Sequence, residues 1–192
     1  RGTATFMILG EICTRACRYC AVTTGKPNEL DVFEPIRVAE SVKTMKLNYC
    51  VITAVNRDDL NDGGATIFAD CIRRIRETSP HCKVEVLIPD LQGDWDALKI
   101  ILDESPDVLN HNIESTRTIF PIVRAKGNYD LSLDLLSKSK SIDNSIVTKS
   151  GIIVGMGETT QQLTETMKDL RSVECDLLTI GQYLRPSQKH LK

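Results

Sequence analysis

The sequence has no run of about 18 apolar residues, so we predict no transmembrane helix. It opens without a signal-peptide pattern. The formal net charge is only −2, which excludes a general basic field for nucleic acid or a membrane surface. No internal repeat or low-complexity segment divides the chain, and we expect one domain over residues 1–192. The expected location is the cytoplasm, or an organellar matrix if the source is eukaryotic.

Histidine is scarce, and the cysteines are odd in number. His81, His111 and His190 are widely separated, so each is more typical of a surface or hydrogen-bonded histidine than of a ligand. Seven cysteines, three of them clustered, fit a disulfide framework poorly and fit a reduced compartment with metal binding better. The other four are scattered, and we interpret them as small buried hydrophobes: Cys50, Cys71, Cys82 and Cys175.

Short apolar runs alternate with amphipathic segments along the whole chain. The runs predict six strands, at residues 5–9, 50–55, 83–88, 107–113, 145–155 and 176–184. The segments predict five helices, at residues 34–47, 68–77, 95–102, 129–140 and 161–173. Asp94 and either Thr159 or Thr160 are suited to cap the helices that follow them. Strict alternation indicates parallel strands joined by right-handed helical crossovers.

Two architectures fit this alternation, an open doubly wound sheet and a partial barrel. The carboxyl ends of the strands distinguish them. All six ends carry polar or glycine residues, such as "NRDD" after the second strand and "HNIE" after the fourth. In parallel β/α folds the functional residues lie at these ends, and polar or glycine residues at every end favour a barrel with a central site.

Three cysteines lie close together in "GEICTRACRYCAV": Cys13, Cys17 and Cys20. Thiolates are soft ligands that select zinc, copper(I) or iron–sulfur clusters. A structural zinc site normally closes four positions, and the sequence offers no second cysteine pair or histidine pair. A [4Fe–4S] cluster held by three cysteines leaves one iron without a protein ligand, and that iron is free to bind a substrate or cofactor.

The Cys-x3-Cys-x2-Cys spacing after the first strand resembles the signature of the radical SAM superfamily. The resemblance implies a partial (β/α)6 TIM-like barrel, in which Cys13, Cys17 and Cys20 hold a [4Fe–4S] cluster. S-adenosylmethionine would chelate the open iron, and its reductive cleavage would give a 5′-deoxyadenosyl radical. Tyr19 matches the aromatic position usual in this motif, near the adenine.

Further blocks resemble the lipoyl synthase family, above all "NRDDLNDGGA" and "HNIE", and they span nearly the whole chain. This resemblance implies a sulfurtransferase that inserts two sulfur atoms at C6 and C8 of a protein-bound octanoyl group. The implied partners are an octanoylated lipoyl carrier domain or H protein and a reductant such as ferredoxin or flavodoxin. No nucleic acid or membrane partner is expected. No catalytic side chain is expected beyond the cluster and the cofactor.

Five more residues are candidates for binding the cofactor. Asn56 and Asp58 follow the second strand and are suited to accept hydrogen bonds from an amino group, although a polar turn also explains them. Asn112 and Glu114 are two residues apart, on one face of an extended strand, and suit ribose hydroxyls or a buried polar pair. Arg124 offers a guanidinium fork that matches a carboxylate.

The sequence departs from the lipoyl synthase pattern in one respect. That family holds a second, auxiliary [4Fe–4S] cluster with an N-terminal CxxxxCxxxxxC motif and a serine of a C-terminal RSSY motif, and these 192 residues contain neither. We expect both motifs to lie outside a truncated sequence; the other explanation is a relative that lacks sulfur insertion. Two alternatives stay open: another radical SAM sulfur-insertion enzyme, similar to biotin synthase, or a non-catalytic zinc-binding β/α module.

Overall fold

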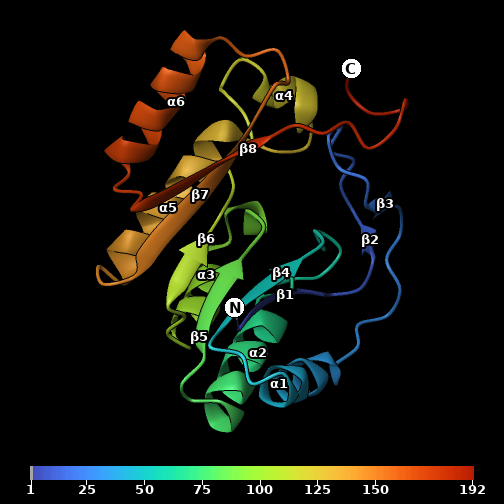
Figure 1. Ribbon diagram of the computed structural model, residues 1–192, viewed down its shortest axis with the longest axis vertical. Helices are drawn as coiled ribbons and strands as arrows, with labels where there is room; N and C mark the ends of the chain where they lie inside the picture. Colours follow the sequence, from blue (N-terminus) through green and yellow to red (C-terminus); the bar gives the residue numbers. More distant parts are fainter. Residues whose placement is uncertain (1) are drawn as a thin grey trace.

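The computed structural model describes residues 2–192, and a six-stranded parallel sheet forms its centre (Figure 1). The strands are β1 (Thr3–Ile8), β4 (Tyr49–Ala54), β5 (Lys83–Leu87), β6 (Val108–Asn110), β7 (Val147–Val154) and β8 (Leu177–Gln182). They pair in the order in which they occur along the chain, with β1 and β8 at the two edges. A doubly wound sheet reverses its strand order at a switch point, and this sheet does not. The prediction of a partial barrel is therefore confirmed.

Helices connect successive strands. They are α1 (Glu34–Thr44), α2 (Ala65–Thr78), α3 (Trp95–Leu102), α5 (Tyr129–Ile142) and α6 (Thr160–Ser172). The predicted caps of α3 and α6 are confirmed: the Asp94 carboxylate accepts from two backbone N–H groups of α3, and Thr159 forms a capping box at α6. Within residues 2–192, no helix combines the length and the apolar character that a bilayer crossing needs.

The structure corrects the sequence-based prediction at the fourth strand. We expected a strand over residues 107–113, but regular pairing in β6 ends at Asn110. Glu114 has a left-handed backbone with φ of 68°, and it rejoins the sheet through a single bridge to Ile152. A residue in that conformation breaks the pleat, so the chain turns there. The short helices η1 (Leu91–Gly93) and α4 (Phe120–Val123) were also not predicted, because a segment of three or four residues is too short to show an apolar repeat.

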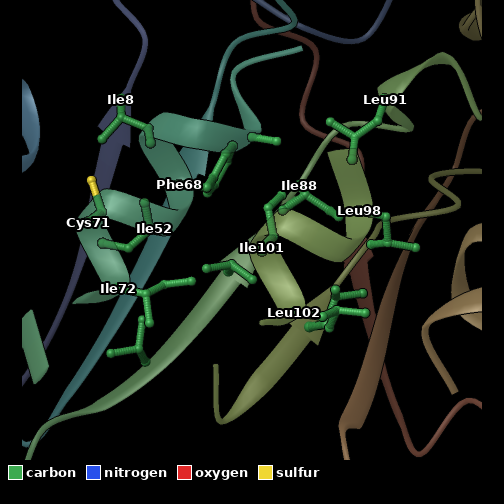
Figure 2. Packing of buried hydrophobic residues seen from close by; sticks show 14 of the residues in the cluster. Ile8, Ile52, Phe68, Cys71, Ile72, Ile88, Leu91, Leu98, Ile101 and Leu102 are labelled. Carbon is green, nitrogen blue, oxygen red and sulfur yellow. The ribbon is translucent and has the colours of Figure 1, made fainter. Parts of the chain in front are cut away.

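The core lies between the sheet and the surrounding helices, as Figure 2 shows for its central part. Ile8 and Ile52 project from β1 and β4 toward α2, whose Phe68 and Ile72 are fully buried. Each such side chain contributes about 1.5–3 kcal/mol relative to an exposed one. The four scattered cysteines are all buried, as predicted.

The other face of the strands carries a polar network. Glu85 of β5 is buried and accepts hydrogen bonds from Tyr49 Oη at 2.6 Å, Asn110 Nδ2 at 2.9 Å and Lys149 Nζ at 2.9 Å. The four residues come from β4, β5, β6 and β7, so the network joins the four central strands of the sheet. Because a buried carboxylate needs several donors, this network fixes the strands relative to one another below the site.

Two backbone positions shape the loop that leaves β1. Leu9 has a left-handed φ of 68°, and its N–H donates to the Glu34 carboxylate at 2.7 Å. Its side chain packs against Gly64, which has φ of +93°, and a Cβ atom there would lie 2.3 Å from Leu9 Cδ1. Only glycine fits this contact without displacing Leu9.

We predict that Gly64→Ala lowers the free energy of unfolding by about 2 kcal/mol, because it adds both backbone strain and a clash with Leu9. Gly181→Ala is the matched control, since a Cβ at Gly181 meets nothing within 4 Å and its φ is not in the left-handed region. Urea denaturation followed by circular dichroism measures both. Equal stability of the two variants would contradict the packing at Leu9.

Candidate functional site

One cavity opens at the carboxyl ends of the strands, with a volume of about 800 Å³ including the part continuous with solvent. Eight of the nine residues predicted to form the site line it: Cys13, Cys17, Tyr19, Cys20, Asn56, Asn112, Glu114 and Arg124. The fold therefore brings together segments that are more than 100 residues apart in the sequence.

The three clustered cysteines lie in the loop between β1 and α1. This loop contains a two-residue parallel pair, β2 (Ile12–Cys13) with β3 (Thr23–Thr24), and the Cys20 N–H donates to the Cys17 carbonyl at 3.1 Å. All three thiols are free and half-buried. Backbone N–H groups point at two of the sulfurs, from Arg15 to Cys13 Sγ at 3.4 Å and from Val22 to Cys20 Sγ at 3.5 Å.

The cysteine loop does not form a site for a single ion. In residues 2–192, no three His, Cys, Asp or Glu side chains converge closely enough to hold one metal ion. A [4Fe–4S] cluster is larger and places each thiolate on a different iron, so separated thiols around an open cavity fit it. Burial raises the pKa of Cys17, and the charge of Arg124 opposes that effect.

The loop is attached to β4 through the backbone. Thr14 donates to the Asn56 carbonyl both from its N–H and from its hydroxyl, each at 3.0 Å, and its hydroxyl accepts from the Asp58 N–H at 3.1 Å. Asn56 faces the cavity, and its Oδ1 atom is buried without a hydrogen-bond partner in the described chain. An acceptor in that state is available to a donor that enters the cavity.

Asp58 differs from the other predicted residues, because it does not line the cavity. Its carboxylate receives two hydrogen bonds from Arg15, both at 2.8 Å. Arg15 also contacts Asp90 at the end of β5, at 2.5 and 2.7 Å. Only 5% of Arg15 is exposed, so this cation lies between two carboxylates inside the protein.

The bridge made by Arg15 perturbs its partners. Burial alone would raise the pKa of Asp90, but the hydrogen bonds and charge of Arg15 lower it to about 2. The pKa of Arg15 itself is raised, because hydrogen bonds to Asp58 and Asp90 outweigh its burial. The sequence-based prediction missed Arg15 and Asp90. Two signals were present: a charged residue between two of the clustered cysteines, and an aspartate shortly after a buried strand.

Asn112 and Glu114 both face the cavity, as their spacing predicts, although Glu114 is not in a regular strand. Asn112 packs on Gly151, where a Cβ atom would lie 2.6 Å from Asn112 Oδ1. Burial raises the pKa of Glu114, opposed by the nearby charge of Arg124 and a hydrogen bond from Asn112. The pair offers two adjacent acceptors on one wall of the cavity.

Arg124 is 6% exposed and ends the short helix α4. Its Nη1 donates to the Asn112 carbonyl at 3.0 Å, while its Nε is buried without a partner in the described chain. Arg124 forms no ion pair with any carboxylate of residues 2–192. Tyr19 also lines the cavity, and burial raises its pKa, helped by the negative charges of Glu114 and Cys17.

In a regular strand, the spacing that places Asn112 and Glu114 on one face would place His111 on the opposite face, yet His111 also lines the cavity. Its two ring nitrogens are engaged by the Ile88 carbonyl at 2.9 Å and Ser132 Oγ at 3.1 Å. Burial lowers its pKa to about 4. His111 is therefore a neutral, hydrogen-bonded part of the cavity wall, as the sequence analysis predicted for a histidine that is not a ligand.

We predict that Arg15→Met lowers the free energy of unfolding by about 3 kcal/mol, because it leaves Asp58 and Asp90 unpaired beside each other. Arg37→Met is the matched control: its ion pair with Asp31 has side chains 57% and 51% exposed, and we expect less than about 1 kcal/mol. Denaturant titration at pH 7 measures both.

The same bridge predicts a pH dependence. Because the pKa of Asp90 is lowered from 3.8 to about 2, its stabilisation is present above pH 3.8 and disappears as the pH falls through about 2. Asp90→Asn should remove this part of the acid sensitivity. An unchanged acid titration of unfolding in that variant would show that Asp90 is not paired.

Comparisons with known proteins identify relatives of this chain. The whole chain is 57% identical over 192 residues to a lipoyl synthase from Staphylococcus carnosus, and it spans 62% of that protein's length. This confirms the resemblance seen in the sequence. Two solved structures share the fold at low identity. SuiB from Streptococcus suis, bound to S-adenosylmethionine, has a TM-score of 0.77 at 8% identity, covering 99% of this chain and 42% of SuiB. Methylornithine synthase (PylB) has a TM-score of 0.72 at 12% identity, covering 97% of this chain and 55% of PylB.

A sequence profile gives the broadest assignment. Residues 7–170 match the radical SAM superfamily, and this range contains all three clustered cysteines and every residue named above as lining the cavity. We conclude that the chain belongs to the radical SAM superfamily.

Proposed function

We propose that this chain is the radical SAM core of a lipoyl synthase. The enzyme would insert two sulfur atoms at C6 and C8 of an octanoyl group held on a carrier protein. The observation that carries the proposal is a complementary pair of unpartnered groups in one cavity: the Asn56 Oδ1 acceptor and the Arg124 Nε donor. An amino acid carries one group for each, an ammonium and a carboxylate. The methionine part of S-adenosylmethionine has both.

Membership of the superfamily implies a [4Fe–4S] cluster and S-adenosylmethionine as cofactors. Cys13, Cys17 and Cys20 would hold the cluster, since their thiols line the cavity and the four other cysteines are buried in the core. When bound, these groups supply an electron and a carbon radical strong enough to take hydrogen from an unactivated C–H bond. The protein's task is then placement and the exclusion of water.

Different residues of this chain would bind different groups of the cofactor. Arg124 would bind the carboxylate of the cofactor, because its guanidinium is buried, free of other carboxylates and positioned by Asn112. Asn56 would accept a hydrogen bond from the amino group. Asn112 and Glu114 would accept from the ribose hydroxyls, and Tyr19 would lie against the adenine. Asp58 would act indirectly, by pairing with Arg15.

Apolar residues form the remaining walls of the cavity. Met7, Val22, Leu87 and Ile88 line it from β1, the cysteine loop and the end of β5. Such walls suit an alkyl chain and exclude water from a radical. They support an acyl substrate over a charged one.

The finer parts of the proposal concern the whole protein, since this chain spans 62% of the S. carnosus lipoyl synthase. We propose that residues 1–192 form one core domain and that the whole protein binds a second, auxiliary [4Fe–4S] cluster. Its substrate would be an octanoylated carrier domain or H protein, and its reductant would be ferredoxin or flavodoxin.

The decisive experiment is anaerobic reconstitution followed by analysis of iron, sulfide and product. We expect a coloured protein whose reduced cluster changes its paramagnetic resonance spectrum when S-adenosylmethionine is added. We expect Cys17→Ala to abolish 5′-deoxyadenosine formation, because the cluster then loses a ligand. Cys175→Ala is the control, since Cys175 is buried in the core, and it should retain cleavage. A colourless protein that binds one zinc would support the zinc-module alternative instead.

The role of Arg124 has its own test. We predict that Arg124→Gln weakens S-adenosylmethionine binding about 10- to 100-fold, because one charge-assisted contact is lost. Arg117→Gln removes a cation whose side chain is 52% exposed and paired with Asp130. This control variant should bind S-adenosylmethionine as tightly as the original chain. Equilibrium dialysis with the reconstituted protein gives both constants. Equal binding by the two variants would remove Arg124 from the cofactor site.

A further inference from the structure

Several exposed cations form no ion pair with any residue of 2–192, and five of these lie where the cysteine loop meets residues 119–128 and 183–192, outside the cavity. We call them the basic rim: Arg18, Lys126, Arg185, Lys189 and Lys192. Most other arginines of residues 2–192 are paired, including Arg37, Arg73 and Arg117, whose side chains are also exposed. Unpaired cations close together are unfavourable for the free protein, so their gathering calls for an explanation.

The charge of the chain is segregated along the sequence. Residues 12–28, 119–128 and 183–192 contain eight of the 24 Lys and Arg residues and none of the 26 Asp and Glu residues. They therefore carry a formal charge of +8, and the remaining residues carry −10, which together give the net −2. The near-neutral composition of the whole chain conceals this separation.

Tertiary contacts place these three segments side by side. The Arg18 N–H donates to the Val123 carbonyl at 2.8 Å, and the Leu191 N–H donates to the Arg18 carbonyl at 3.1 Å. Lys126 Nζ donates to the Thr14 carbonyl at 3.0 Å. Figure 1 shows the last residues crossing from β8 to the loop that contains β2 and β3. The basic rim is thus one surface built on the outside of the cysteine loop.

The position of the basic rim relative to the three clustered cysteines limits which class of protein could bind there. Arg18 lies between Cys17 and Cys20 in the sequence, and His190 Nε2 is 3.1 Å from the Cys20 carbonyl oxygen. None of the five rim residues lines the cavity. A protein docked there would lie directly against the cysteine loop without reaching the cavity. That arrangement serves electron transfer to the cluster, whereas a carrier that inserts an acyl chain must contact the cavity mouth.

We propose that the basic rim is the docking surface of a small acidic redox protein that reduces the cluster. This inference rests on the proposed function, because it needs a cluster at Cys13, Cys17 and Cys20. One electron passes from the reduced donor to the bound cluster, and no bond forms or breaks in that step. Charge complementarity would raise the rate of encounter and make it sensitive to salt.

The test compares two doubly substituted chains of equal net charge. Lys189→Glu/Lys192→Glu reverses two charges of the rim without touching a cluster ligand or a cavity residue. Lys138→Glu/Lys168→Glu reverses two exposed, unpaired charges on α5 and α6. Each reconstituted chain is reduced by an acidic flavodoxin at low ionic strength, and separately by dithionite. The appearance of the reduced-cluster resonance signal is followed over time.

We expect the rim variant to be reduced by flavodoxin about tenfold more slowly, with dithionite reduction unchanged and the α5/α6 variant within twofold of the original chain. Raising the salt concentration should slow the original chain toward the rim variant. Equal slowing of both variants, or none, would overturn the proposal. Loss of binding to an octanoylated carrier domain in the rim variant, with flavodoxin reduction intact, would assign the surface to the carrier instead. A chain that gains no cluster would fail with dithionite too, and that outcome would count against the proposed function.

Discussion

The site depends on Arg15, which holds the cysteine loop on the sheet. Its guanidinium lies between the carboxylates of Asp58, after β4, and Asp90, after β5. A charge this deeply buried is stable only when its hydrogen bonds are satisfied, and both carboxylates supply them with short, direct contacts. Arg15 lies between Cys13 and Cys17, so the bridge also fixes where two of the thiols can be. Thr14 adds backbone and hydroxyl bonds to the same strand end.

The cavity is polar where that fixed loop meets the strand ends and apolar elsewhere. Within it, Asn56 and Arg124 keep one buried polar atom each without a partner in the described chain. Orphan atoms of this kind are costly in a finished core, and they are expected where a ligand supplies the missing partner. Two further features also indicate a ligand site: the strained backbone at Glu114 and the close approach of Asn112 to Gly151. Both direct hydrogen-bond acceptors into the cavity at the cost of regular strand pairing.

The surface outside the loop follows a different rule. Inside, Arg15 is neutralised by two carboxylates and Arg124 is shielded by burial, whereas the basic rim has no such neighbours in the described chain. Arg15 thus holds the cysteine loop, whereas Arg124 is proposed to bind a cofactor and the basic rim is proposed to bind a partner. The basic rim becomes evident only when the three cationic segments are considered together.

Much of this protein was predictable from its sequence, because periodicity and spacing are local properties. The alternation of apolar runs and amphipathic segments indicated the six β/α units, and decoration of every strand end favoured a barrel. The Cys-x3-Cys-x2-Cys spacing indicated a cluster with one open iron, and eight of the nine predicted site residues line one cavity. Only the tertiary structure decided which charged side chains pair with one another. Asp58 reads as a cofactor ligand in the sequence, yet it pairs with Arg15, and Asp90 joins it from a strand that no local pattern connects to the cysteine loop. Which charges meet depends on how the loops pass over the strand ends, and that path follows from the packing of the whole sheet.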